Sequence, residues 1–400
     1  MEKLISLAKR RGFIYQGSEI YGGLAGTWDY GPLGVLLKEN VKALWLKMFR
    51  GERGDVYGLD ASIIMNPKVW EASGHVAGFA DPMENGEQFN VMFKTSVGAG
   101  EEATVSYLRP ETAQGIFVNF KNVVDSFHPK LPFGIAQVGK AFRNEISPRD
   151  FIFRQREFEQ MEVEYFVKES EWEKSFEMWR KTMHQFGERV GIKQIHELDV
   201  PDNDRAHYSK KTIDFEFEYP FGRKELWGLA YRTDYDLRSH SASSGQALEY
   251  FDEESGERFT PHVIEPSLGV DRTILAILTS AYTEDDLGGE TRSYLKLPKE
   301  IAPIRAAVFP LLKNKSELVE KAREVYKMLK SEFGNIEFDD NGNIGKRYRR
   351  QDEIGTPFCV TIDFDTLGET PEYKDTVTVR NRDTGEQKRV KISDLKEVVA

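Results

Sequence analysis

The alternation of apolar and polar positions is clearest in residues 133–166, where two strand-like segments flank a polar turn. Residues 147–150 (Ser-Pro-Arg-Asp) supply the turn chemistry that separates the two predicted strands. Because side chains alternate between the faces of a strand, Arg143 and Glu145 are expected to share one face of the first strand. The same rule gives the second strand two distinct faces. One face carries Arg154, Arg156, Phe158, Gln160 and Glu162, and the other carries Glu157, Glu159, Met161 and Val163.

Helical periodicity is strongest after Pro32, a residue that favours the first turn of a helix. Apolar residues at spacings of three and four continue to Phe49, so we expect either a core helix or a subunit contact. A second amphipathic stretch predicts a helix over residues 170–190, ended near Gly191. Shorter helices are predicted at residues 3–11 and 116–122.

Several further segments have strand composition, rich in aromatic and β-branched residues. They are residues 213–219, 225–231 and 262–265. The last of them runs into a helix that begins at Val270. Nearer the N-terminus, a helix-to-strand passage is expected to end at Pro67, and a polar stretch follows at residues 84–102.

The pattern changes near residues 297–303, which contain two prolines. Beyond this point strands alternate with helices, and no glycine-rich phosphate loop is present, so a small α/β domain is predicted. The predicted elements are strands at 306–312, 335–340, 356–364 and 376–382 and a helix at 317–333. A loop that runs through Arg350 is expected between the second and third of these strands.

Composition narrows the class of protein. With 400 residues, 40% hydrophobic and 30% charged, the chain is an ordinary globular protein of two or three domains. The single cysteine, Cys359, excludes a disulfide framework and a cysteine-based metal cluster, and it fits a reducing cytosol. The N-terminus is too charged for a signal peptide, and no apolar run is long enough for a membrane span. We therefore expect a cytoplasmic protein with no membrane partner.

The distribution of charge says more than the net charge of −11, which by itself does not indicate a nucleic-acid-binding protein. Residues 303–400 contain equal numbers of basic and acidic residues, so the preceding part carries the whole excess of negative charge. Residues 346–350 (Lys-Arg-Tyr-Arg-Arg) form the densest basic cluster. Both RNA contact and an ordinary solvated loop are compatible with this cluster.

The polar face of the second strand in residues 133–166 suggests a chemistry. Guanidinium groups such as that of Arg154 bind phosphate oxygens through two parallel hydrogen bonds. A ring such as Phe158 can stack on a purine, and a carboxylate such as Glu162 can hold an ammonium group. The face therefore suits a nucleotide followed by an amine. The alternative is a sheet whose polar face is merely solvated.

Three residues outside this hairpin add to the picture. Arg272 lies at a predicted helix start, where a cation opposes the helix dipole and so favours a bound anion. Glu265 precedes a proline in an apolar strand and would be costly to bury without a partner. Glu111 precedes another helix start, where helix capping alone could explain it. No histidine has a second ligand at zinc-like spacing.

These features occur in a recognisable order. A long helix with a strand ending at Pro67, a hairpin with Phe-Arg-Asn-Glu at 142–145, and a strand–helix junction at 269–272 resemble the signature motifs of class II aminoacyl-tRNA synthetases. The segments RPETAQG, FRNEISPR, REFEQMEVEYF, EPSLGVDR and YRRQDEIGTPFCVT resemble glycyl-tRNA synthetases of the homodimeric type. The resemblance covers nearly the whole chain.

The resemblance implies a fold and an activity. Residues 1–300 would form an α+β catalytic domain on a mostly antiparallel sheet, with an insertion remnant at about 84–104 and a helical segment at about 169–192. A small α/β anticodon-binding domain would occupy residues 301–400. The implied homodimer would activate glycine with ATP and Mg²⁺ and transfer it to the tRNA for glycine.

The same resemblance implies roles for individual residues. Arg143, Glu145 and Arg272 would be catalytic, with Arg143 and Glu145 on the α-phosphate and the adenine and Arg272 on the γ-phosphate. The ATP-binding set would be Arg143, Asn144, Glu145, Phe153, Arg154, Gln155, Arg156, Glu157, Phe158, Glu225, Leu226, Gly269, Val270, Asp271 and Arg272. The glycine-binding set would be Glu111, Phe158, Glu159, Gln160, Met161, Glu162, Glu265, Pro266, Ser267, Leu268 and Gly269. The anticodon contacts would be Lys346, Arg347, Arg349 and Arg350, and Glu225 would hold Mg²⁺ through ATP.

The chain departs from the family pattern after Asp81-Pro82. Many relatives carry a longer insertion there, with cysteine pairs and an arginine near the substrate, and this chain has only a few residues. We therefore expect no zinc and weaker contacts to the tRNA acceptor stem. A non-catalytic accessory subunit on the same scaffold is an alternative, but the presence of Arg143, Glu145 and Arg272 argues against it. A prolyl or threonyl enzyme is another, and the carboxylate-rich pocket favours glycine.

Overall fold

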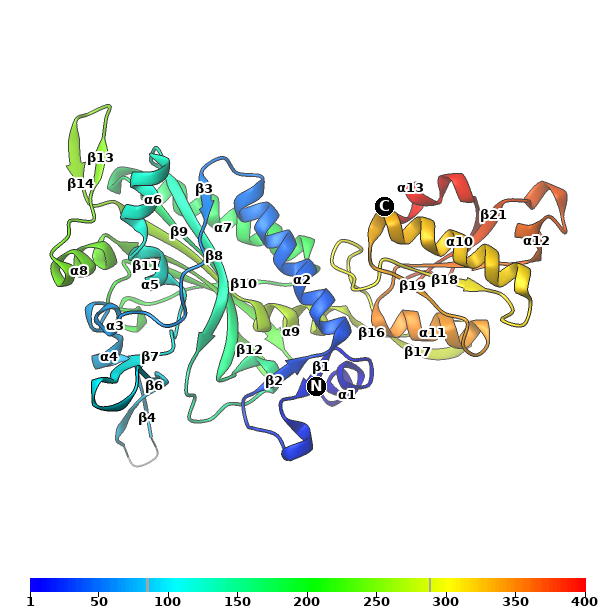
Figure 1. Cartoon of the computed structure of the whole chain (residues 1–400), viewed down its shortest axis with the longest axis horizontal. Coiled ribbons are helices and arrows are strands. Elements are labelled where there is room, and N and C mark those ends of the chain that lie inside the picture. The colour runs from blue at the N-terminus through cyan, green and yellow to red at the C-terminus, as the bar shows by residue number, and fades with distance from the viewer. Residues whose placement is uncertain (84–85, 288) are drawn as a thin grey trace.

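The computed structural model describes residues 1–83, 86–287 and 289–400, and a seven-stranded sheet dominates it (Figure 1). The strand order is β10-β11-β12-β15-β9-β8-β3, and each neighbouring pair is antiparallel except the parallel pair β3–β8. The bounds are β3 Val56–Gly58, β8 Phe133–Phe142, β9 Glu157–Val167, β10 His196–Asp199, β11 Lys211–Tyr219, β12 Gly222–Thr233 and β15 His262–Gly269. The predicted, mostly antiparallel sheet is confirmed.

One face of this sheet is covered by three helices. They are α2 Pro32–Leu46, continued by a π-helical segment Lys47–Gly51, α7 Trp172–Arg189 and α9 Val270–Ala281. Pro32 occupies the first turn of α2, as its fixed backbone angle favours. Leu37, Val41 and Trp45 of α2 are fully buried against the sheet. The apolar stripe of α2 is therefore part of the core, while Val35 stays exposed.

The opposite face is covered only at one end. There α5 Ala113–Phe117, α6 Phe120–Phe127 and α8 Tyr235–Ser244 pack on the sheet. Aromatic contacts dominate this second core, with the Phe120 ring 4.7 Å and the Phe133 ring 5.1 Å from the ring of Phe166. The rest of the face is left accessible.

Short elements surround the sheet. They are α1 Glu2–Arg10, β1 Ile14–Gln16, β2 Trp28–Tyr30, α3 Pro67–Ala72, α4 His75–Gly78, β4 Ala80–Pro82, β5 Gln88–Asn90, β6 Lys94–Val97, β7 Thr104–Tyr107, β13 Tyr250–Asp252 and β14 Glu257–Phe259. The predicted insertion remnant at about 84–104 begins with Glu84 and Asn85, which lie outside the described residues. Its remainder contains β5 and β6.

The C-terminal part has its own five-stranded sheet, in the order β19-β18-β20-β21-β22. Strand β18 is parallel to both of its neighbours and the remaining pairs are antiparallel. The elements are β18 Ala306–Pro310, α10 Ser316–Phe333, β19 Ile336–Phe338, α11 Ile344–Ile354, β20 Phe358–Ile362, α12 Phe364–Leu367, β21 Thr376–Asn381, β22 Gln387–Lys391 and α13 Leu395–Val399. The predicted alternation of strands and helices is confirmed.

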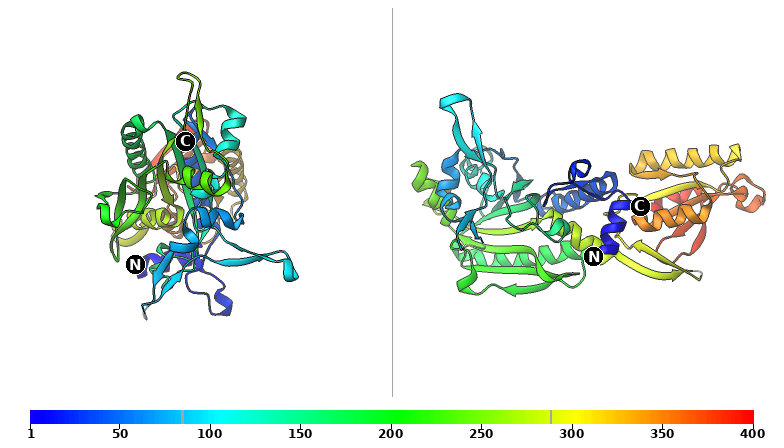
Figure 2. Two further views of the ribbon diagram at one scale, coloured as in Figure 1. Left: turned by 90° about the vertical axis from the view of Figure 1, so that its left-hand side faces the viewer. Right: turned by 90° about the horizontal axis from the view of Figure 1, so that it is seen from below.

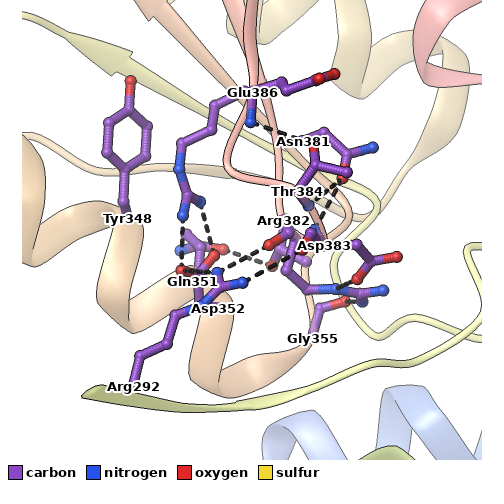
Figure 3. Close-up of polar contacts among 12 residues, drawn as sticks. Arg292, Tyr348, Gln351, Asp352, Gly355, Asn381, Arg382, Asp383, Thr384 and Glu386 are labelled. Carbon is purple, nitrogen blue, oxygen red and sulfur yellow. Dashed lines mark hydrogen bonds and ion pairs between the residues drawn. The ribbon is translucent and has the colours of Figure 1, made fainter. Parts of the chain in front are cut away.

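A hairpin ties the two sheets together. Its strands, β16 Tyr282–Leu287 and β17 Glu290–Leu295, follow α9 and run along the C-terminal part against α11 (Figures 1 and 2). Arg292 of β17 donates to Asp352 of α11 at 2.8 Å (Figure 3). Arg380 of β21 donates to the same carboxylate at 2.7 and 2.9 Å. All three side chains are buried, so a desolvated ion cluster fixes the hairpin to the C-terminal part.

Three predictions of local structure are wrong. Strand β8 ends at Phe142 and β9 begins at Glu157, so the four charged residues assigned to the ends of these strands lie in the connection between them. They are Arg143, Glu145, Arg154 and Arg156. Pro67 begins helix α3 instead of ending a strand, and the nearest strand, β3, ends at Gly58. The predicted helix 116–122 is two helices, α5 and α6.

The loop predicted through Arg350 is also wrong, because residues 344–354 form α11. Asn343 caps this helix by accepting a hydrogen bond from the amide of Lys346, and Gly355 ends it in a left-handed conformation. The buried side of α11 includes Arg347, Gln351 and Asp352. Its buried side therefore lacks the apolar periodicity by which a helix is usually predicted.

Candidate active site

A cavity of about 340 Å³ opens on the less covered face of the central sheet. Phe158, Gln160 and Glu162 of β9 line it, as do Gly228 and Ala230 of β12 and Ser267 of β15. These β9 residues are the part of the predicted polar series that lies within the strand, and they do share one face. The sides of the cavity come from the β8–β9 connection and from residues 200–212.

At one end the cavity is lined by cations, and we call Arg143, Arg154 and Arg272 the arginine end. The guanidinium of Arg143 lies 5.2 Å from the ring of Phe79 and 5.3 Å from that of Phe158, and it donates to the Pro110 carbonyl at 3.1 Å. These contacts hold Arg143 beside an aromatic wall without pairing it to a carboxylate. A guanidinium held in this way is suited to an incoming phosphate.

The connection between β8 and β9 is braced by ion pairs. Arg154 pairs with Glu145 at 2.6 Å and with Asp81 at 3.0 Å. Arg156 donates to the carbonyls of Ala25 and Glu145 at 2.6 and 3.1 Å. Arg156 therefore holds loops together, whereas Glu145 and Arg154 line the cavity.

Arg272 enters the cavity from the first turn of α9. Its guanidinium lies 4.4 Å from the ring of Phe153 and pairs with Glu225 at 3.0 Å. Asp214 of β11 lines the cavity as well, and burial together with repulsion from Glu225 and Glu216 raises its pKa to about 6. Asp214 was not predicted as a site residue.

The other end of the cavity is lined by three acids and a serine. We call Glu111, Glu162, Glu265 and Ser267 the carboxylate end. Glu162 accepts hydrogen bonds from Ser267, at 2.6 Å, and from Thr112. The cavity thus brings together these four members of the predicted glycine-binding set.

Glu111 is held from behind. His75 approaches one of its oxygens at 3.4 Å, and Gln114 donates to the other at 2.9 Å. The Nδ1 atom of His75 lies 2.7 Å from the hydroxyl of Ser73. This chain of contacts fixes the Glu111 carboxylate and explains the position of His75, which the sequence left undefined. The predicted alternative, that Glu111 caps a helix, has no support because the structure shows no side-chain cap on α5.

Arg232 and Asp236 lie behind the carboxylate end and were missed by the sequence analysis. Arg232 is buried, pairs with Asp236 at 2.8 Å and with Glu265, and stacks 3.8 Å from the ring of Tyr208. The signal was present, because alternation along β12 places Arg232 two positions after Ala230, on the cavity face. Arg232 is a buried cation that compensates the charges of Asp236 and Glu265.

The acids at this end differ electrostatically. Burial opposes ionisation of Glu111, but His75 and Arg232 attract the charged form more strongly and hold its pKa well below the ordinary value. Burial and repulsion from Glu111 raise the pKa of Glu162. Burial also raises the pKa of Glu265, and Arg232 limits that rise. The carboxylate end therefore holds more negative charge than its own cations neutralise, which favours a cationic ligand.

Two predicted site residues point away from this cavity. The Glu159 carboxylate pairs with Lys38 at 2.9 Å and with Lys42 at 3.0 Å, both on α2. Asp271 accepts from the hydroxyl of Tyr30 at 2.6 Å and from the Glu159 amide at 2.9 Å. Both residues form part of the wall, but their carboxylates face a second cavity of about 470 Å³ beside α2. The Glu159 carboxylate is therefore engaged by the two lysines of α2, and these contacts do not support a side-chain contact with glycine.

Other predicted residues do not line the main cavity. They are Asn144, Arg156, Glu157 and Val270 from the ATP-binding set and Met161, Pro266 and Leu268 from the glycine-binding set. Met161 and Leu268 are fully buried on the opposite face, in the core against the helices. Runs of consecutive residues in a strand cannot all face one ligand, because alternate side chains point away.

The basic cluster at 346–350 lies on α11. Arg347 is buried and donates to the carbonyls of Pro310, Asp340 and Gly342 at 2.5, 2.9 and 2.8 Å. Arg350 pairs with Asp339 at 2.5 Å. The structure thus contradicts an RNA contact by Arg347, whose side chain is buried and whose two terminal guanidinium nitrogens donate to backbone carbonyls. Lys346 and Arg349 are exposed.

Within the part of the chain that the structure describes, every helix is too short or too polar to cross a membrane.

Two known protein families match this chain, one over the part with the central sheet and one over the C-terminal part. Residues 93–281 match the family described as tRNA synthetase class II core domain (G, H, P, S and T), and residues 305–400 match the family described as anticodon binding domain. The chain is 48% identical to a glycine–tRNA ligase of Lachnospira eligens, 47% to one of Macrococcus caseolyticus and 46% to one of Geobacillus thermodenitrificans. These matches cover 99% of this chain and 96 or 97% of each relative.

The alignment with the Lachnospira eligens protein spans 461 positions, although this chain has only 400 residues. The relative therefore carries at least 61 positions, the difference between these lengths, that have no counterpart here. This agrees with the prediction that the chain lacks an insertion, although the alignment length does not locate it.

Proposed function

Since the chain belongs to the family of glycine–tRNA ligases, which join glycine to tRNA, we propose that its main cavity is where glycine and ATP react. The enzyme activates glycine with ATP, releases pyrophosphate and then transfers glycine to the 3′ end of tRNA. One observation supports the location most directly. A single cavity joins an arginine end, suited to phosphates, to a carboxylate end, suited to an ammonium group.

ATP binds at the arginine end. Arg143 contacts the α-phosphate, Arg272 the γ-phosphate, and Phe158 stacks on the adenine. Arg143 pairs with no carboxylate of the described residues, and the pair between Arg272 and Glu225 is partly exposed and can open for a phosphate. Glu145 lies beside the same wall, where it can accept from the adenine amino group.

The reaction needs little covalent chemistry from the protein. The glycine carboxylate attacks the α-phosphorus and pyrophosphate leaves, and the nucleophile is already ionised, so no general base is required. The work of the site is to align the two reactants and to neutralise the charge that develops on phosphate oxygens. Arg143, held by aromatic contacts, does this without first giving up an ion pair, whereas Arg272 first releases Glu225.

The residues present fit Mg²⁺ bound with ATP. Glu225 and Asp214 line the cavity near Arg272, and carboxylate oxygens are the ligands that Mg²⁺ prefers. Burial, followed by the negative charges of Glu225 and Glu216, raises the pKa of Asp214, and a divalent cation would balance that charge. When bound, Mg²⁺ would neutralise phosphate charge. We expect no zinc.

Glycine is selected at the carboxylate end. Glu111, Glu162 and Glu265 attract its ammonium group, and Ser267 with its neighbours crowds the space where a larger side chain would go. Forcing an extra methyl group into a packed site costs roughly 1–3 kcal/mol, so alanine is rejected by a moderate factor.

Helix α11 contacts tRNA in this proposal. The C-terminal part matches an anticodon-binding domain, and Lys346 and Arg349 present positive charge on the exposed side of α11. Arg350, half-buried and paired with Asp339, lies at the edge of this surface. Arg347 is left out because it is buried.

The proposal also covers the domain division, the oligomeric state and the cellular location. The domains divide near residue 300, so that residues 1–300 form the catalytic domain and 301–400 the anticodon-binding domain. The enzyme is a homodimer, supported by exposed Val35 on α2 and by the second cavity beside that helix. It works in the cytoplasm, where its tRNA substrate is charged.

Pyrophosphate exchange with single amino acids tests the proposal. We expect glycine to support exchange, and alanine and serine to be at least about tenfold poorer in kcat/KM, since a methyl group costs roughly 1–3 kcal/mol. Exchange with alanine equal to that with glycine would contradict the crowded pocket. Glycine-dependent exchange that survives loss of the Glu111 carboxylate (Glu111→Gln) would contradict the location.

A further inference from the structure

Among the residues that the structure describes, Glu164 has no hydrogen-bond partner. It is fully buried, and neither of its carboxylate oxygens accepts from any of these residues. Glu164 follows Glu162 by two positions on β9, so its side chain lies on the same face as the carboxylate end. Burying an ionised carboxylate without a partner is strongly unfavourable, so we do not expect this group to be charged and unpaired.

The surroundings of Glu164 are acidic. Oxygens of Glu162, Glu164 and Glu265 lie within 4.8 Å of one another. Because Ile264 pairs with Tyr165, Glu265 and Glu164 occupy neighbouring positions on β15 and β9. On the other side of β9, the residue of β8 opposite Glu164 is the apolar Ile135.

The charged groups that face Glu164 come from several elements: Glu162 on β9, Glu265 on β15, Arg232 on β12 and Asp236 on α8. Each of the other acids has a donor. Glu162 accepts from two hydroxyl groups, and Glu265 and Asp236 accept from Arg232. Three carboxylates this close cannot all be ionised in a buried site. The acid without a donor is the one that keeps a proton.

The shift in pKa agrees with this assignment. Burial and the charge of Glu265 raise the pKa of Glu164 well above its ordinary value, and the attraction of Arg232 does not reverse the shift. A metal ion is a poorer explanation, because Glu162 and Glu265 already use oxygens to accept from Ser267, Thr112 and Arg232.

We propose that Glu164 is a neutral carboxylic acid whose hydroxyl donates to Glu265, and that it positions the Glu265 carboxylate for the ammonium group of glycine. The inference rests on the proposed function of the cavity. Glu164 does not line the cavity, so it is a positioning residue and not a ligand. The proton on Glu164 removes a negative charge that would repel the Glu265 carboxylate. The hydrogen bond that it forms holds this carboxylate in place beside β9.

Two substitutions of similar length separate the possibilities. Glu164→Gln keeps a neutral donor in place, and Glu164→Met removes the donor but fills the space. We expect Glu164→Gln to change the glycine KM in pyrophosphate exchange by less than about threefold, and Glu164→Met to raise it by about tenfold or more, as for loss of a hydrogen bond to a charged group. An equal rise in both variants would show that Glu164 acts through a negative charge. No rise in either would show that it only fills space. Both results overturn the proposal.

Stability against pH gives a readout that needs no substrate. Folding holds a proton on Glu164 that the unfolded chain releases above about pH 4.3, so the wild type loses unfolding free energy as pH rises above that value. Glu164→Gln lacks this group. The difference between its urea midpoint and that of the wild type should therefore shift in favour of the variant as pH rises from about 5.5 to 7.5. A constant difference between the two proteins would overturn the protonated state.

The two proposals fail separately. If the wild type exchanges pyrophosphate with glycine but Glu164→Gln behaves like Glu164→Met, the cavity keeps its function and only the role of Glu164 is lost. If the wild type shows no glycine-dependent exchange, the function of the cavity fails, while the urea midpoints still decide the protonation of Glu164.

Discussion

At the scale of single residues, Arg143 bears most of the proposed catalysis. Its guanidinium lies between the rings of Phe79 and Phe158 and has no carboxylate partner among the described residues. A cation held in this way stabilises charge on a phosphate without giving up an ion pair first. Sequence patterns identified Arg143, Glu111 and Glu162 through a family resemblance, but they missed Arg232 and Glu164. Both could have been predicted, because Glu164 lies two positions after Glu162 on β9 and Arg232 two positions after Ala230 on β12.

We predict that Arg143→Ala lowers the rate of pyrophosphate exchange by about 10²–10³, as for loss of one preorganised donor to the reacting group. The fold should be unaffected, because Arg143 is only half-buried and donates a single backbone hydrogen bond. Arg149→Ala is the matched control. Arg149 lies in the same connection, is exposed and does not line the cavity. A normal rate in Arg143→Ala, or an equal loss in Arg149→Ala, would contradict the role of Arg143.

At the scale of elements, the long strands of the central sheet were predicted, and the connection between β8 and β9 and helix α11 were not. The alternation of side chains along β9 was predicted correctly from Phe158 onward. Residues 151–153 form a 3-10 turn, so the strand does not extend back to Arg154 as predicted. Helix α11 was missed because buried Arg347, Gln351 and Asp352 replace the apolar stripe. Buried polar residues such as Arg347 and Asp352 are paired with residues distant in the sequence, and a local sequence pattern does not show these partners.

The exposed side of α11 makes a prediction of its own. The double variant Lys346→Ala/Arg349→Ala should raise the KM for tRNA by about fivefold or more and make it less sensitive to salt, because phosphate contacts are lost. Pyrophosphate exchange, which needs no tRNA, should not change. Lys327→Ala/Lys388→Ala, which removes two exposed lysines elsewhere in the C-terminal part, is the control. Equal effects of the two double variants would count against a specific surface on α11.

At the scale of the whole molecule, the catalytic sheet and the C-terminal part are joined through the hairpin that follows α9. The pairing of Arg292 with Asp352 spans 60 residues of sequence, and only the assembled fold brings the two side chains together. The same helix, α9, supplies Arg272 to the cavity, so the cavity and the C-terminal part share one continuous segment of chain. Composition and periodicity predicted both sheets but not this connection.

The central claim is that one cavity binds ATP at its arginine end and glycine at its carboxylate end. A crystal structure of the enzyme with glycine and a non-hydrolysable ATP analogue tests it most directly. We expect phosphate oxygens on Arg143 and Arg272 and the glycine ammonium group among Glu111, Glu162 and Glu265. An ammonium group outside the carboxylate end, or phosphates away from both arginines, would contradict it.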